Sequence, residues 1–275
     1  MKAIGLIGGM SWESTALYYQ IINREIGRRL GGLRSARLQL TSLDFEQVVA
    51  RQRTGAWDQL ASMLADAARG LEAAGSDCLL IGTNTMHRVA AEVQAAVSIP
   101  LLHIADATVA AIRDAGCRTV ALLGTRYTME QPFYVGHLAR HGIRCVVPDD
   151  AGRAEVHRVI FDELCKGVFD AGSRERLRRI IQWQIDRGAE GVVLGCTELS
   201  LTLSPRDVGL PLFDTTALHA LAAVDFALAP AALPACPGAS VSGPPDTLAG
   251  RFPRHEAHLA FHALHLRHRR SQLTP

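Results

Sequence analysis

The chain has 275 residues with 29 basic and 27 acidic side chains, so its formal charge is +2. A charge this close to zero argues against a nucleic-acid surface over the main body. No apolar run approaches the roughly 20 residues that a membrane helix needs, and the first residues lack the pattern of a signal peptide. We therefore expect a cytoplasmic protein with no membrane or nucleic-acid partner, and the hydrophobic content of 48% supports a large core.

The first half of the chain alternates short apolar runs with amphipathic segments. Apolar residues in these segments recur with the 3.6-residue period of a helix. The pattern predicts strands at 3–7, 38–43, 78–81 and 100–104, and helices at about 14–30, 57–71, 85–97 and 105–115.

The second half repeats this alternation. Strands are expected at 119–123, 143–147, 191–194 and 211–213, and helices at 130–140, 155–169, 174–187 and after Asp214 to about Leu228. Strands that alternate with helices of 10–15 residues are typical of βαβ units and parallel sheets.

Two pairs of strand ends resemble each other across the halves. IGLIGGM near the N-terminus resembles VALLGTR about 116 positions later, and CLLIGTNT resembles GVVLGCTE about 113 positions later. These offsets predict an α/β fold of two pseudo-symmetric parallel-sheet domains that face each other across a cleft. Ligands bind at the carboxyl ends of the strands in such sheets.

The expected first domain comprises residues 1–104 plus 206–229, and the expected second domain comprises residues 105–205. Residues 230–275 differ in composition, because prolines are followed by a stretch rich in His and Arg. We expect them to form a linker and a poorly ordered tail, although the His spacing would also suit metal binding on one helix face.

The second pair of turns carries the candidate chemistry. A strand-to-helix turn offers free backbone N–H groups and a positive dipole end, which suit a carboxylate and could lower the pKa of a thiol at Cys196. Asn84, Thr85 and Thr197 would add neutral donors. Each turn begins with a residue able to carry a proton, Thr83 in one and Cys196 in the other. Two such groups on opposite sides of a bound molecule would suit inversion at a stereocentre.

Composition and spacing give no sign of a bound cofactor. The six cysteines include no CxxC pair, and no cysteine–histidine cluster in the body of the chain has zinc spacing. The first glycine-rich turn is not GxGxxG, and there is no Walker loop. Pyridoxal phosphate would need a Schiff-base lysine, but the only lysines are Lys2 and Lys166. The expectation is thiol chemistry without metal or cofactor.

Several motifs together resemble the aspartate/glutamate racemase family, in particular its bacterial amino-acid racemase branch with a Thr/Cys catalytic pair. They are IGLIGGMSWESTALYY, LDFEQV, GTNTMH, HIADAT, LLGTRYTMEQ and GCTEL, in an order that runs from Met1 to about Leu228. The resemblance implies a homodimeric, pyridoxal-phosphate-independent isomerase that interconverts L- and D-aspartate or glutamate.

The resemblance also implies roles for individual residues. Thr83 and Cys196 would be the catalytic pair, and the substrate-binding residues would be Met10, Gln52, Asn84, Thr85, Thr125, Thr197 and Glu198.

The sequence departs from most of the family at Thr83, where a second cysteine is usual. A hydroxyl is a much weaker acid than a thiol. We therefore expect asymmetric chemistry, in which Cys196 deprotonates the L-substrate well and the reverse direction is slow.

Other interpretations stay open at this point. His87 could form a dyad with Cys196, as in a thiol hydrolase or transferase, or could merely cap or pack. Lys166, or one of Arg51 and Arg53 in an expected loop, could bind a distal carboxylate. The same fold could also serve a maleate isomerase, a hydantoin racemase, a malonate decarboxylase or a non-catalytic protein that binds acidic amino acids.

Overall fold

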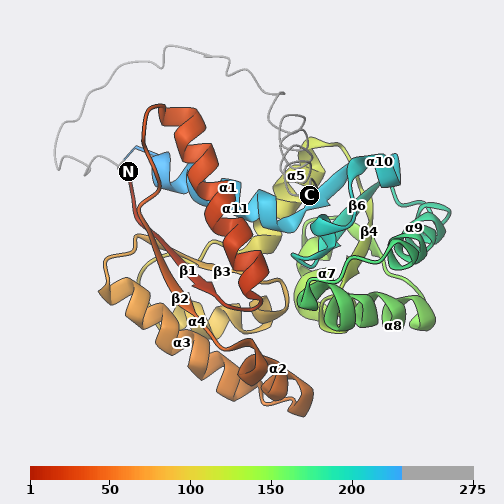
Figure 1. The fold of residues 1–275 in the computed structure, drawn as a ribbon, viewed down its shortest axis with the longest axis horizontal. Helices are drawn as coiled ribbons and strands as arrows, with labels where there is room; N and C mark the ends of the chain where they lie inside the picture. The colour runs from red at the N-terminus through yellow and green to blue at the C-terminus, as the bar shows by residue number, and fades with distance from the viewer. Residues whose placement is uncertain (231–275) are drawn as a thin grey trace, which may run out of the picture. The chain divides into compact units, whose positions relative to one another are not determined.

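A computed structural model of the protein describes residues 1–230, and Met1–Ala229 form one compact unit. The predicted linker and tail lie outside the described residues. The unit contains two parallel sheets, one in each half of the chain, with helices packed around both (Figure 1). Together with the two-domain fold of the related structures reported below, this confirms the predicted α/β class.

The first sheet has the strand order β2-β1-β3. Its strands are β1 (Ile4–Gly8), β2 (Leu38–Ser42) and β3 (Cys78–Ile81). The strand expected at 100–104 is reduced to a single parallel bridge between Leu79 and Leu101. The helices of this half are α1 (Trp12–Leu30), α2 (Phe45–Thr54), α3 (Trp57–Ala73), a 3₁₀ turn (Thr85–Val89) and α4 (Ala90–Ala95).

The second sheet has the order β5-β4-β6-β7. Its strands are β4 (Thr119–Gly124), β5 (Arg144–Val146), β6 (Gly191–Gly195) and β7 (Leu212–Asp214). Its helices are α5 (Ile104–Asp114), α6 (Arg126–Glu130), α7 (Pro132–Arg140), α8 (Asp150–Arg158), α9 (Ala171–Ile185), α10 (Pro205–Val208) and α11 (Thr215–Leu228). Shorter turns are a π-helical segment (Val159–Glu163) and 3₁₀ turns at Leu164–Lys166 and Leu199–Leu201.

The central strand pair is equivalent in the two sheets. β1 lies parallel to β3, and β4 lies parallel to β6. Every residue of these four strands is buried, as expected for parallel strands covered on both faces. The close approach at one end requires glycine, because a Cβ on Gly124 would lie 2.8 Å from the Gly195 carbonyl oxygen.

Two segments differ from the sequence-based expectation. Residues 45–54 form helix α2, which is capped by the Asp44 side chain accepting from the Glu46 N–H, where a loop was expected. The helix expected at 155–169 is interrupted, because α8 ends at Arg158 and the π-helical segment follows.

The C-terminal part of the unit contacts both halves. β7 pairs with β6 in the second sheet, although residues 206–229 were assigned to the first domain. Helix α11 instead packs along α1 and α5, and the Lys2 N–H donates to the Ala227 carbonyl (Figure 1). The helices of residues 1–230 are all too short or too polar to cross a membrane.

Candidate active site

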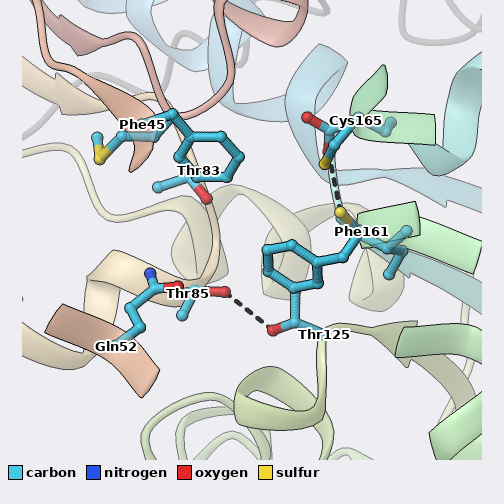
Figure 2. Close-up of a pocket in the computed structure, with 11 residues that line it drawn as sticks. Phe45, Gln52, Thr83, Thr85, Thr125, Phe161 and Cys165 are labelled. Carbon is cyan, nitrogen blue, oxygen red and sulfur yellow. Dashed lines mark hydrogen bonds between the residues drawn. The ribbon is translucent and has the colours of Figure 1, made fainter. Parts of the chain in front are cut away.

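The carboxyl ends of four strands meet at one pocket. Met10 follows β1, Thr83 and Thr85 follow β3, Thr125 follows β4, and Cys196 follows β6. The pocket holds about 330 Å³ of empty space including its open mouth. Among residues 1–230, the pocket is lined by Met10, Phe45, Gln52, Thr83, Thr85, Thr125, Ile160, Phe161, Cys165, Cys196 and Glu198. Figure 2 shows Phe45, Gln52, Thr83 and Thr85 on one side, and Thr125, Phe161 and Cys165 on the other.

Cys196 is the first residue beyond β6, and its side chain is held by a carboxylate. Cys196 as a whole is 8% exposed, and its thiol donates to Glu198 Oε2 at 2.9 Å. Burial and, next, the charge of Glu198 raise the pKa of the Cys196 thiol well above its usual value. The expected lowering of this pKa by a helix dipole is therefore wrong. The segment that follows Glu198 is only the three-residue 3₁₀ turn Leu199–Leu201.

Glu198 is the most heavily hydrogen-bonded group of the pocket. The residue is 2% exposed, and its Oε1 accepts from the Ser11 hydroxyl at 2.7 Å. Oε2 accepts from the Thr197 hydroxyl at 2.7 Å in addition to the Cys196 thiol. Thr197, an expected substrate contact, thus fixes Glu198 and does not line the pocket. Ser11 was not among the predicted site residues, although it lies in the first turn after β1.

Thr83 lies at the equivalent position beyond β3 but is held differently. Its N–H donates to the Ile81 carbonyl at 2.8 Å, and its carbonyl lies 2.8 Å from His87 Nδ1. Among the described residues, its hydroxyl has no hydrogen-bond partner and faces the pocket. The structure therefore brings both predicted proton carriers to one cavity.

Three more predicted residues take part in two separate polar links between the two halves. The Thr85 and Thr125 hydroxyls lie 2.9 Å apart, which links the turn after β3 to the turn after β4 (Figure 2). The Asn84 Nδ2 donates to Thr215 Oγ1 at 2.9 Å, and that hydroxyl donates to the Leu194 carbonyl. These bonds fix the orientation of the amide. Asn84 Oδ1 is then buried and accepts no hydrogen bond from the described residues. Asn84 itself is not among the lining residues.

The remaining predicted residues, Met10 and Gln52, both line the pocket. Gln52 lies on α2 and its Nε2 is 3.3 Å from Met86 Sδ, so the loop expected around it is in fact a helix. Arg51 and Arg53 lie on the same helix but do not line the pocket.

Sequence reasoning missed four lining residues: Phe45, Ile160, Phe161 and Cys165. The rings of Phe45 and Phe161 stack with a 6.4 Å centroid separation and come from the two different halves. Phe45 belongs to the motif LDFEQV, which was a usable signal. The other three lie where the expected helix is interrupted, a change that no sequence pattern indicated.

The alternative roles for His87 and Lys166 find little support. Both His87 ring nitrogens are already engaged, Nδ1 with the Thr83 carbonyl and Nε2 with the Ile104 N–H at 3.1 Å. Neither is directed at Cys196 as a dyad would require. Lys166 is exposed, lies 3.9 Å from Asp162, and is not a lining residue.

One cluster outside the pocket could in principle hold a metal ion. His103, Asp106 and His137 bring three ligand atoms within 4.8 Å of one another. However, His103 Nδ1 already accepts from the Ala105 N–H, and the His103 and His137 rings stack in parallel at 4.7 Å. Stacked rings do not aim their nitrogens at a common point, so the cluster is poorly shaped for a metal.

Comparisons with known proteins agree with this geometry. A solved structure from Yersinia pestis, described as a candidate Asp/Glu racemase, is 48% identical and covers 83% of this chain and 100% of that chain, with a TM-score of 0.79. An aspartate racemase homologue from Pyrococcus horikoshii OT3 is 37% identical over 82% of this chain and 99% of that chain, with a TM-score of 0.71.

A curated relative, the broad specificity amino-acid racemase RacX of Bacillus subtilis (strain 168), is 27% identical over 172 residues, which is 62% of this chain and 74% of RacX. The family model described as Asp/Glu/hydantoin racemase matches residues 7–223. These similarities support an isomerase that racemises amino acids. With most of its length matched by that model, this chain belongs to the Asp/Glu/hydantoin racemase family.

Proposed function

We propose that this protein is a cofactor-independent racemase that interconverts L- and D-aspartate or glutamate by removing and returning the α-proton. The observation that carries the proposal is the presence of Thr83 and Cys196 in one pocket, at equivalent strand ends of two different sheets. Inversion needs proton carriers on opposite faces of the α-carbon, and this arrangement can supply them.

In the L-to-D direction, Cys196 acts as the base. Its proton passes along the existing hydrogen bond to Glu198, and the thiolate then takes the α-proton. The Thr83 hydroxyl donates a proton to the opposite face of the carbanion. Thr83 regains a proton from solvent and Glu198 loses one to solvent, so the proton balance of the cycle closes.

The neutral polar groups around the pair suit an amino-acid backbone. The Thr85 and Thr125 hydroxyls are hydrogen-bonded to each other, and the one that accepts in this bond can donate its own hydrogen to the α-carboxylate. Asn84 supports the same site from behind, because its amide holds the turn after β3 against Thr215. Neither of the two lysines lines the pocket, which supports chemistry without a Schiff base.

Substrate choice and assembly are part of the same proposal. The Asp/Glu description of the Yersinia pestis protein favours acidic substrates. A cytoplasmic homodimer is also proposed. Large exposed aromatic side chains on one face of α1, Trp12 at 66% and Tyr19 at 55% exposure, support a surface that a second copy covers. Light scattering of the purified protein tests that assembly.

Chiral chromatography tests the activity. Purified protein, dialysed to remove any pyridoxal phosphate, is incubated separately with L-aspartate, L-glutamate and a 5-substituted hydantoin, because the family description includes hydantoin racemases. The proposal expects the D-enantiomer from at least one of the two amino acids. Inversion of the hydantoin alone would assign the chain to the other branch of its family.

A further inference from the structure

His87 joins the turn that carries Thr83 to the start of another helix. Its Nδ1 lies 2.8 Å from the Thr83 carbonyl oxygen, and its Nε2 lies 3.1 Å from the backbone nitrogen of Ile104, the first residue of α5. The side chain is 3% exposed. Both contacts are therefore made in a protected interior, where a lost hydrogen bond is costly.

The two backbone partners determine which ring nitrogen carries the proton. A carbonyl can only accept, so Nδ1 must bear the hydrogen and donate it to Thr83. The Ile104 N–H can only donate, so Nε2 must be the acceptor. This arrangement requires a neutral imidazole. Burial, together with the nearby His103 and His219, lowers the pKa of His87 well below its usual value and is consistent with that state.

The two proton carriers are thus oriented by different means. Cys196 is held through its own side chain by Glu198. The Thr83 hydroxyl has no such partner among residues 1–230, so its direction depends on its backbone and on the few rotamers of a β-branched side chain. The peptide that His87 holds is the one that leaves Thr83, and its plane helps to set the direction of the Thr83 side chain.

We propose that His87 is a positioning residue, which holds the Thr83 peptide through its Nδ1–H so that the Thr83 hydroxyl faces the α-carbon of the substrate. The role rests on the proposed racemase function and adds to it the residue on which the Thr83 half of the reaction depends. His87 does not touch the substrate and is not a pocket-lining residue.

Two amide substitutions separate the two hydrogen bonds of His87. The amide of Asn can reproduce the Nδ1–H donor to Thr83, whereas the amide of Gln reaches the Nε2 position and can accept from Ile104. We expect His87→Asn to keep the wild-type kcat within about threefold and His87→Gln to lower it by about tenfold or more. Each variant loses one buried hydrogen bond, so the Tm should fall in both.

The comparison distinguishes positioning from a merely structural role. If kcat followed the Tm in both variants, or if Gln were the more active, the proposal would be overturned. Inactive wild-type protein would instead count against the racemase function itself.

A second measurement does not depend on turnover or on variants that fold well. Nitrogen-15 NMR of the histidine-labelled wild-type protein reports the protonated ring nitrogen of each imidazole, and sequential assignment of the wild-type spectrum identifies His87. The proposal requires a proton on Nδ1 and none on Nε2. Observation of the opposite tautomer would overturn it even if both variants were unstable.

Discussion

The turn after β3 and the turn after β6 have the same local sequence pattern, an apolar run that ends in glycine. The first residue is held by its backbone in one turn and by its side chain in the other. Cys196 is buried, and its side chain donates to a carboxylate that also accepts from Ser11 and Thr197. Thr83 is partly exposed in the pocket, and its contacts are made by its backbone. The difference teaches that two residues can occupy equivalent strand ends while the groups around them give each a separate chemistry.

The largest expected effect is the loss of Cys196. Replacement by Ala, or by Ser, whose hydroxyl is a weaker acid, should lower kcat by at least about 10³-fold, because no other lining thiol among residues 1–230 lies at the end of a strand. Chiral chromatography of L-glutamate incubations measures the loss. Cys145→Ala, which removes a thiol from β5 that does not line the pocket, serves as the matched control and should retain activity.

A second substitution tests the Glu198 carboxylate, which is present in the turn after β6 and has no counterpart in the turn after β3. Glu198→Gln should lower kcat by about 10²-fold, since the thiol loses its proton acceptor. The Glu198 charge raises the pKa of Cys196, so its removal should lower that pKa and shift the alkylation of the thiol to lower pH.

Ser11→Ala is the graded comparison for this experiment. It removes one hydrogen bond to Glu198 Oε1 but leaves the charge in place, so the pH profile of alkylation should move less. An unchanged profile in Glu198→Gln would show that the carboxylate does not act on the thiol.

A third substitution makes the two turns alike. Because L- and D-enantiomers have equal free energy, kcat/KM must be the same in both directions, and any asymmetry appears in kcat and KM together. We expect the wild type to show a larger kcat from the L-substrate, and Thr83→Cys to move the ratio of the two kcat values toward one. Equal kcat values in the wild type would refute the asymmetry expected from a weakly acidic hydroxyl.

The smallest effect is expected from a change outside both turns, the deletion of the C-terminal residues. Both turns and the eleven lining residues named above belong to the compact unit Met1–Ala229. Deletion of residues 230–275 should therefore leave kcat within about twofold and the Tm unchanged. Loss of folding or turnover, measured by circular dichroism and the chiral assay, would show that the C-terminal residues contribute to the site.

Strand-borne parts of the site could be predicted because their signals are local. An apolar run that ends in glycine identified the positions of Thr83, Thr125 and Cys196, and parallel strands bring such ends together. The expected family is confirmed by the match over residues 7–223.

The parts that failed depend on features with no local signature. Helix α2 has few apolar residues and many Arg and Gln, so its apolar residues show little helical periodicity. The segment around Gln52 was therefore expected to be a loop, and it is a helix. Cys165 carries no signal of a pocket residue, because the helix interruption that brings it to the pocket leaves no sequence pattern. The raised pKa of Cys196 follows from burial beside Glu198, and only the folded structure reveals that burial.

The central claim is that Cys196 removes an α-proton, and proton NMR in D₂O tests it most directly. Wild-type protein and Cys196→Ala are incubated separately with L-aspartate and with L-glutamate, without added cofactor. The account predicts loss of the α-proton signal of at least one substrate with the wild type, and no loss with Cys196→Ala. Absence of exchange in the wild type, or exchange that persists in Cys196→Ala, would contradict it.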